Sequence, residues 1–283
     1  MQNKTLDVRP SPIAGTWYDS NPLQLAEVVD GYIENADLPE LPGEVIALVA
    51  PHAGFRYSGP VAGHAFKAVK GKSFDQVVVI SPMHQYYPQP LLTTGHDAYQ
   101  TPLGTIPLAV EAISEIDQQL RTRTGLSLTP IKYDQEHSLE IELPFLQRSL
   151  KNPFQLIPIM LRSQNREVSK TLGEILGDVV RDKSCLIVAS SDLSHFYHET
   201  QANQLDQNVL RQIADFSPEG LYEIHERGQG QACGLAAIAT SLWAAKTLGA
   251  EDVTILNYDT SGSSTGDHTS VVGYGAAAIT RPQ

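Results

Sequence analysis

Polar side chains that could bind a ligand follow directly after three runs of apolar residues. The runs 45–50, 77–81 and 185–190 lead into His52, His84 and the segment 192–195, which contains Asp192 and His195. Continuous apolar runs of this length are typical of strands buried on both faces of a largely parallel sheet. Open α/β sheets bind their ligands at the carboxyl ends of such strands. We therefore predict a ligand site where these strands end, and we expect the first two strands to be neighbours.

His52 and His84 are candidate metal ligands, because imidazole is the commonest protein ligand for metal ions. Cys233 could supply a third, anionic ligand, which would leave coordination positions open for a substrate. It lies in the glycine-rich loop 228–234, at the expected N-terminus of a helix, where the helix dipole and free N–H groups favour a thiolate. The alternative, which the residue types alone favour, is that Cys233 is a small apolar residue packed in a loop.

Asp192 and His195 are candidates for proton transfer. If the segment between them turns helically, both side chains face one side, and the carboxylate would orient the imidazole for acid–base catalysis. An equally weighted alternative is that Asp192 caps the N-terminus of a helix. A hydrolase that uses Ser191 or Cys233 as its nucleophile is a weaker alternative, because neither residue lies in a Gly-x-Ser-x-Gly elbow.

His137 and Glu140 lie three positions apart, just before Glu142. They could form a metal-ligand pair, or they could begin a helix whose first turn places acids near the positive end of the dipole. We favour the helix start. The chain contains no His-Glu-x-x-His motif, no phosphate-binding P-loop and no Gly-x-Gly-x-x-Gly motif, so it offers no sequence support for those three kinds of site.

The elements that must position these residues alternate between apolar runs and segments of helical periodicity. Besides the three strands above, we expect strands at 91–94, 154–161, 252–258 and 270–279. We expect helices at 23–33, 60–69, 110–120, 168–180, 199–214, 218–226 and 235–248, a helix start within 136–146, and a flexible segment at 261–267. The alternation predicts an α/β fold with a largely parallel or mixed central sheet and helices on both faces, in a single domain over residues 1–283.

The composition argues against several classes of protein. The chain has 283 residues, of which 41% are apolar and 18% charged, as is typical of globular proteins. Its net charge of −12 argues against nucleic-acid and anionic-membrane partners, since both prefer a basic surface. No apolar run approaches the roughly 20 residues of a membrane span, and residues 1–7 lack the apolar core of a secretory signal. Two cysteines are too few for a disulfide framework, so we expect a cytoplasmic protein.

Six motifs, in this order along the chain, resemble those of the Memo family. They are Ala14-Gly15-Thr16-Trp17-Tyr18, the segment 51–60, Thr101-Pro102-Leu103-Gly104, Glu136-His137-Ser138-Leu139-Glu140, the segment 190–195 and Ala232-Cys233-Gly234. The resemblance extends from about Arg9 to about Ala278. It implies a fold similar to that of the LigB-type class III extradiol dioxygenases, which are non-haem iron enzymes that open catechol rings.

The resemblance also implies roles for particular residues. His52, His84 and Cys233 match the metal ligands of the family, with Fe(II) as the expected ion and copper as the alternative. His195 matches the acid–base histidine of the dioxygenases, with Asp192 beside it. The dioxygenases have a carboxylate where Cys233 lies, and a thiolate changes metal preference, so ring-opening activity does not transfer with the fold.

The pocket implied by the resemblance is lined by Tyr57, and we also place His137 there. Two features depart from the usual family pattern, and we expect them to alter the polarity of the pocket. The chain has Ser81-Pro82-Met83-His84 where the family has Gly-Pro-Ser-His or Gly-Pro-Asn-His, and it has Phe55 where tyrosine is common. The implied function is metal-dependent redox or dioxygenase-related chemistry on a small molecule. The alternative is a binding module that holds a peptide or small ligand in the same cleft without turnover, since members of the family have been linked to signalling scaffolds. The natural substrate and the oligomeric state stay open.

Overall fold

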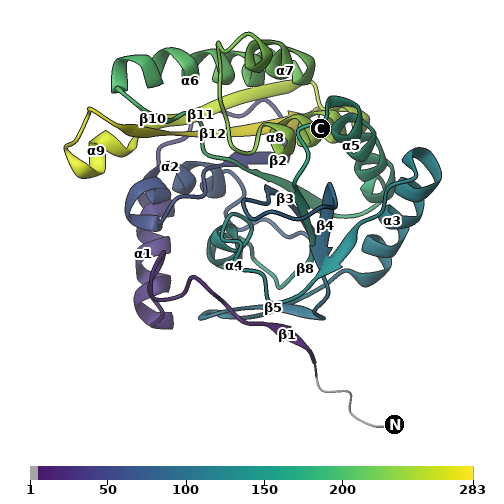
Figure 1. Ribbon diagram of the computed structural model, residues 1–283. Coiled ribbons are helices and arrows are strands. Elements are labelled where there is room, and N and C mark those ends of the chain that lie inside the picture. The colour runs from purple at the N-terminus through teal and green to yellow at the C-terminus, as the bar shows by residue number, and fades with distance from the viewer. Residues whose placement is uncertain (1–5, 283) are drawn as a thin grey trace.

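The structure, a computed structural model, describes residues 6–282 and has a mixed β-sheet at its centre (Figure 1). The order of the strands is β10-β12-β2-β9-β3-β8-β4-β7, with β11 paired to β12. The strands are β2 (Glu44–Ala50), β3 (Gln76–Pro82), β4 (Leu91–Thr94), β7 (Thr129–Ile131), β8 (Gln155–Leu161), β9 (Cys185–Ser190), β10 (His195–Tyr197), β11 (Asp252–Thr260) and β12 (Val271–Arg281). β2, β9, β3 and β8 run parallel, whereas β12 is antiparallel to β2. A separate small sheet contains β1 (Val8–Arg9), β5 (Ala98–Thr101) and β6 (Gly104–Pro107).

Helices cover both faces of the central sheet. They are α1 (Pro22–Asn35), α2 (Phe55–Lys67), α3 (Val110–Thr124), α4 (Leu143–Ser149), α5 (Arg166–Val180), α6 (Glu199–Ala214), α7 (Pro218–Glu226), α8 (Leu235–Thr247) and the short α9 (Ser261–Thr265), with a 3-10 turn η1 (Glu140–Glu142) before α4. α1 and α2 lie on the opposite side of the sheet from α3 and α5 (Figure 1). The expected α/β class, with a mixed sheet between helices, is confirmed.

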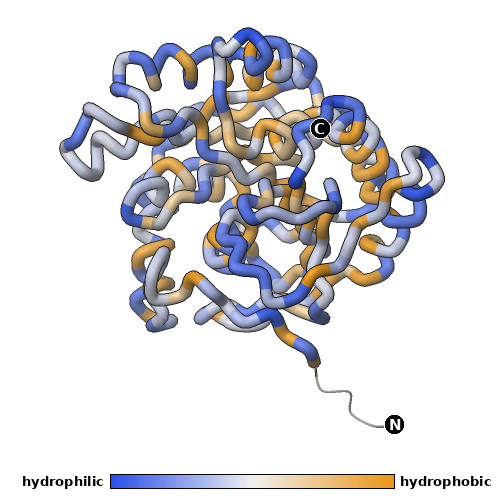
Figure 2. Tube along the Cα trace, in the orientation of Figure 1, coloured by the Kyte–Doolittle hydropathy of each residue, from blue (hydrophilic) through white to orange (hydrophobic). Residues whose placement is uncertain are grey.

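One hydrophobic core lies on each face of the sheet, because alternate residues of a strand point to opposite faces. In β3, Val78 and Ile80 pack into one core with α3, α5 and α8, whereas Val77 and Val79 pack into the other with α1, α2 and α4. The apolar segments concentrate in the interior, and polar segments surround them (Figure 2). This double burial explains why the strands appear in the sequence as continuous apolar runs. Within residues 6–282, the helices all fall short of the length and apolar character that a membrane crossing requires.

The expectation that β2 and β3 are neighbours is wrong, because β9 lies between them and pairs with both. Ala50 at the end of β2 is in register with Ser190 at the end of β9. The chain just beyond β9 therefore passes between the two segments that carry His52 and His84. The carboxyl ends of the three strands at which we predict the ligand site are therefore adjacent, in the order β2, β9 and β3.

Several local expectations differ from the structure. α2 begins five residues before the expected start at residue 60 and contains Pro60, and its first N–H, that of Phe55, donates to the carbonyl of Trp17 at 3.0 Å. Residues 195–197 form a strand and not a helical turn. The segment expected to be flexible at 261–267 includes the helical turn α9. The prediction that residues 1–7 lack the apolar core of a secretory signal falls mostly on residues 1–5, which lie outside the described part of the chain.

Candidate metal centre

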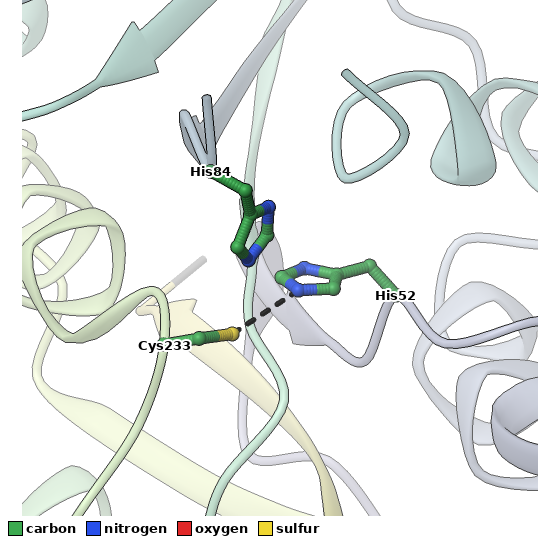
Figure 3. Close-up of side chains that lie close together, drawn as sticks. All are labelled: His52, His84 and Cys233. Carbon is green, nitrogen blue, oxygen red and sulfur yellow. Dashed lines mark hydrogen bonds between the residues drawn. The ribbon is translucent and has the colours of Figure 1, made fainter. Parts of the chain in front are cut away.

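His52, His84 and Cys233 converge at the carboxyl ends of β2 and β3 and just before α8 (Figure 3). Their possible ligand atoms all lie within 4.8 Å of one another. His52 Nε2 is 3.1 Å from Cys233 Sγ, although the two residues are 181 positions apart in the chain. The rings of His52 and His84 have centroids 5.5 Å apart and stand nearly perpendicular, at 83°. The structure therefore brings together the three residues that the sequence selected.

His52 is fixed by hydrogen bonds on the far side of its ring. Its Nδ1 is 2.9 Å from Ser190 Oγ, and the Ser190 hydroxyl in turn lies 2.7 Å from Glu142 Oε1 and 2.6 Å from the carbonyl of Ser138. Burial, together with the neighbouring His137 and His84, lowers the pKa of His52 well below its usual value. The ring is thus neutral, with Nε2 aimed at Cys233, which is the form of imidazole that binds metals.

His84 is fixed in the same way by Glu136. Its Nδ1 is 2.9 Å from Glu136 Oε1, and its backbone N–H donates to Oε2 at 2.6 Å. The backbone N–H groups of His137 and Ser138 also donate to Oε1, each at 3.0 Å. Burial opposes the charge on Glu136, but the contact with His84 and these N–H donors outweigh it and lower the pKa of Glu136 far below its usual value. Because Nδ1 is engaged, Nε2 of His84 remains for a ligand, as is usual for metal-bound histidines.

Cys233 lies just before the N-terminus of α8, where the sequence analysis places it. α8 begins at Leu235 with Gly234 as its N-cap, so Cys233 lies one residue before the cap. Burial, together with the carboxyl group of Asp192, raises the pKa of the thiol. This opposes the thiolate that a helix N-terminus would favour and agrees with the alternative of a small apolar residue, which the residue types alone favour. A Cβ on Gly234 would lie 2.4 Å from the carbonyl oxygen of Ser190, so only glycine allows this loop to approach the end of β9 and place Cys233 beside His52.

The donor set fits a first-row transition metal. Ligand bonds of about 2.1 Å to nitrogen and about 2.3 Å to sulfur span about 3.1 Å when they meet at a right angle. The distance between His52 Nε2 and Cys233 Sγ is also 3.1 Å. Two imidazoles and one sulfur suit iron, copper or zinc better than magnesium or calcium, which prefer oxygen ligands.

A cleft of about 560 Å³ opens above His52 and His84. Both residues line it, as do Tyr57 and His137, which we expected there, whereas Cys233 is not among the lining residues. The remaining walls include the aromatic side chains of Trp17, Phe196 and Tyr274 and the polar side chains of Thr16, Asp192, His195, Ser261, Thr265 and Ser270. The candidate centre therefore has an open side toward a ligand-sized space.

Asp192 and His195 both line the cleft, but the expected hydrogen bond between them is absent among the described residues. His195 Nδ1 instead contacts the carbonyl of Leu193 at 2.9 Å, which leaves the lone pair on Nε2. Asp192 Oδ1 accepts the backbone N–H of His52 at 2.8 Å. Because residues 191–194 are not helical, the shared helical face that we considered does not form, and Asp192 orients the His52 loop rather than His195.

The electrostatics of these two residues suit proton transfer. Burial raises the pKa of Asp192 to about 7, although the N–H groups of His52 and Ala53 oppose this shift. Burial also lowers the pKa of His195, against the opposing contact with Leu193. A carboxyl group that titrates near neutrality and a neutral imidazole thus share one cleft.

The two departures from the family pattern do not reach the cleft. Phe55 is buried and packs against Tyr18 and Phe145, with ring centroids at 5.3 and 4.9 Å. Ser81 and Met83 are also buried, and none of these three side chains is among the residues that line the cleft. Our expectation that they alter the polarity of the pocket is therefore wrong.

His137 is clamped between two rings. Its centroid lies 4.0 Å from that of Trp17 and 4.8 Å from that of His84, and both pairs are stacked. Burial lowers the pKa of His137 to about 4, although the carboxylate of Glu136 opposes this shift. Glu140 does not join it as a metal pair; it lies in η1, as the alternative of a helix start predicts.

Replacing His137 with phenylalanine is expected to change how stability depends on pH. Between the usual pKa of about 6.5 and the folded-state value of about 4, the unfolded chain binds a proton at His137 that the folded chain does not. The stabilisation is therefore complete above about pH 6.5 and is lost as the pH falls through this window. In chelator-treated protein, wild type should lose up to about 3 kcal/mol relative to His137→Phe between pH 6.5 and 4, as measured by urea unfolding. A difference that does not change with pH would contradict the assigned shift.

Sequence reasoning missed three residues that support the site, namely Glu136, Ser190 and Trp17. A signal existed for Glu136, because it directly precedes His137 in a motif that was singled out. Ser190 has no role of its own in the sequence analysis, where it only ends a strand, but its buried hydroxyl contacts His52. Nothing in the spacing of Trp17 indicates that it stacks on a ring 120 positions away.

Comparisons with known proteins agree with these motifs. A family model described as Memo-like protein matches residues 9–278. A protein of Nitrosopumilus maritimus named MEMO1 family protein is 31% identical over 95% of this chain and 98% of its own length. MEMO1 family proteins of Methanopyrus kandleri and Aquifex aeolicus are each 32% identical, over 96% and 94% of this chain and 99% and 97% of their own lengths.

Proposed function

This chain belongs to the Memo-like protein family, and from that premise we propose that it binds a redox-active metal ion through His52, His84 and Cys233. We propose Fe(II) as the ion, with copper as the alternative, and a metal-dependent redox or dioxygenase-related reaction of a small molecule in the cleft. The observation that carries the proposal is the convergence of His52 Nε2 and Cys233 Sγ at 3.1 Å, while hydrogen bonds to Nδ1 hold both imidazole rings.

The residues around the ion have separate tasks in this proposal. A bound ion would supply electron transfer and open coordination positions. His195, with its lone pair on Nε2, accepts a proton from a ligand in the cleft. Asp192 is the second candidate for proton exchange, because burial raises its pKa to about 7 in the metal-free protein, and the charge of a bound ion would lower that pKa. Ser190 and Glu136 keep His52 and His84 in the orientation that presents Nε2.

The test is metal binding by anaerobically purified protein. Wild type should hold about one Fe(II) or Cu(I) per chain, and Cys233→Ser and His52→Ala should lose most of it, because two ligands cannot replace a three-ligand site. Cys185→Ser is the matched control, since Cys185 is a buried cysteine in β9, away from the cleft. Circular dichroism checks that each variant is folded. Wild-type protein that takes up neither ion would defeat the proposal.

A binding module without turnover is the second candidate, and the aromatic mouth of the cleft favours it. Phe196 is 76% exposed, although it lines the cleft, and it has a φ of 65°, which is uncommon for a residue other than glycine. Tyr57, which also lines the cleft, is 38% exposed. Such side chains suit stacking on a peptide or an aromatic ligand. Ligand affinity that survives chelation and Cys233→Ser would favour this candidate over the first.

We also propose that the protein acts in the cytoplasm. Both cysteines are free thiols, and Cys233 lies beside His52 rather than near a disulfide partner. A reducing compartment keeps this sulfur available for metal binding.

A further inference from the structure

A buried ion cluster ties the N-terminal segment 8–18 to the loop that precedes η1. Arg9 is only 1% exposed, and its guanidinium makes four hydrogen bonds. Nε and Nη2 contact the two carboxylate oxygens of Asp134 at 3.1 and 2.6 Å, Nη1 contacts Glu140 at 2.6 Å, and Nη2 donates to the carbonyl of Glu136 at 2.9 Å. The guanidinium also lies over the ring of Tyr99, 4.9 Å from its centroid.

The loop held by Arg9 is the one that orients His84. Asp134 Oδ1 accepts the N–H of Glu136 at 3.1 Å, and the side chain of Glu136 contacts both the backbone and Nδ1 of His84. Two contacts therefore separate Arg9 from a candidate metal ligand: from Arg9 to the loop, and from the loop to His84. Glu140 lies at the other end of the loop and also accepts the hydroxyl of Tyr18 at 2.6 Å.

The other end of the N-terminal segment, at Trp17, contacts His137 and the loop that follows His52. The ring of Trp17 stacks on His137, which stacks on His84. The carbonyl of Trp17 accepts the N–H of Phe55, three residues after His52. Segment 8–18 thus bridges the loop that follows β2 and the loop that precedes η1, although no residue in it is a candidate ligand.

We propose that segment 8–18 is a positioning strap, in which Arg9 and Trp17 set the ring orientation of His84 and thereby the affinity of the metal site. Arg9 is a positioning residue, because it acts through Glu136. The part that concerns affinity rests on the proposed metal site, whereas the part that concerns the orientation of His84 does not.

The several hydrogen-bond donors of the Arg9 guanidinium can be tested by substitution with lysine. Lysine keeps the positive charge but is a single-point donor, so it cannot contact both oxygens of Asp134, Glu140 and the carbonyl of Glu136 at once. Arg9→Lys should therefore loosen the loop without leaving two unpaired buried carboxylates. Arg148→Lys is the matched control, because Arg148 makes a similar two-point contact with Asp30 on the protein surface.

The experiment uses the full chain and two measurements. In metal-free, 15N-labelled protein, NMR detects the Nδ1–H of His84 that is hydrogen-bonded to Glu136, and its absence in His84→Asn assigns the signal. In the second measurement, Co(II) is titrated and the cobalt–thiolate absorption of Cys233 reports the affinity. We expect Arg9→Lys to broaden or remove the His84 signal and to weaken Co(II) binding about 10- to 100-fold. Arg148→Lys should change neither.

The outcomes separate the strap from the metal site. A folded Arg9→Lys variant with an unchanged His84 signal and an unchanged Co(II) affinity overturns the proposal. Should Arg9→Lys fail to fold, Asp134→Asn decides in its place, since it weakens the same tie while Arg9 stays paired with Glu140. Wild type that binds no Co(II) counts against the proposed function, but a His84 signal that is lost in Arg9→Lys still supports the strap.

Discussion

The Arg9→Met variant is expected to lose about 3–5 kcal/mol of unfolding free energy, the usual cost of removing one partner from a buried ion pair. Methionine fills a similar volume, so packing is largely kept. The carboxylates of Asp134 and Glu140 would remain buried opposite an apolar side chain, and the carbonyl of Glu136 would lose its donor. Urea unfolding of metal-free protein measures the effect, with metal excluded so that binding does not add to stability.

Two further variants show whether uncompensated charge is the cause. Arg148→Met removes a similar pair with Asp30 on the surface, where such pairs contribute about 0–1 kcal/mol, so it should cost little. The triple variant Arg9→Met/Asp134→Asn/Glu140→Gln removes all three charges and should be more stable than Arg9→Met alone. Equal losses in Arg9→Met and Arg148→Met would show that the cluster is not the stabilising tie described above.

The Glu136→Ala variant is expected to weaken metal binding about 10- to 100-fold, because residues that orient metal ligands typically contribute that much. Without the carboxylate, the ring of His84 loses its contact at Nδ1 and can turn Nε2 away from His52 and Cys233. The backbone N–H groups of His84, His137 and Ser138 also lose their acceptor. Each unpaired buried group costs about 1–3 kcal/mol, so the variant should be less stable as well.

Glu136→Gln serves as the matched variant for this prediction. Its amide oxygen can still accept some of these N–H groups, but it carries no charge. The pKa of Glu136 is lowered in the folded state, so its stabilisation is present above the usual value of about 4.5 and is lost as the pH falls below it. Wild type should therefore lose stability on acidification more steeply than Glu136→Gln. Co(II) titration and urea unfolding across pH 3–7 measure both effects, and a Glu136→Ala variant with wild-type metal affinity would contradict the assigned role.

The strands and the candidate ligands could be predicted from the sequence because each depends on local pattern. Apolar runs fixed β2, β3 and β9 to within about two residues, and the residues that follow them necessarily lie at the sheet edge. The order of the strands could not be predicted in this way, because an apolar run does not indicate which other strand it pairs with. For this reason β9 was not expected between the strands that lead to His52 and His84.

The supporting contacts could not be predicted because they join segments that only the tertiary fold brings together. Arg9 is one arginine among many charged residues, and its burial depends on two carboxylates more than 120 positions away. Spacing alone pairs Asp192 with His195, but residues 191–194 are not helical, and the carboxylate of Asp192 instead accepts the N–H of His52. The sequence left open whether Cys233 is a thiolate or a packed apolar residue, because the burial that raises the pKa of its thiol depends on the tertiary fold.

A newly synthesised chain acquires this site late, because its parts come from both halves of the translated sequence. Arg9 and Asp134 are 125 residues apart, and His52 and Cys233 are 181 residues apart. Contacts with such long separations form slowly, since loop closure precedes any stabilisation that they provide. A nascent chain on the ribosome would expose two imidazoles before their sulfur partner emerges from the exit tunnel. The proposed metal site would therefore be complete only after both halves of the chain have been synthesised and folded.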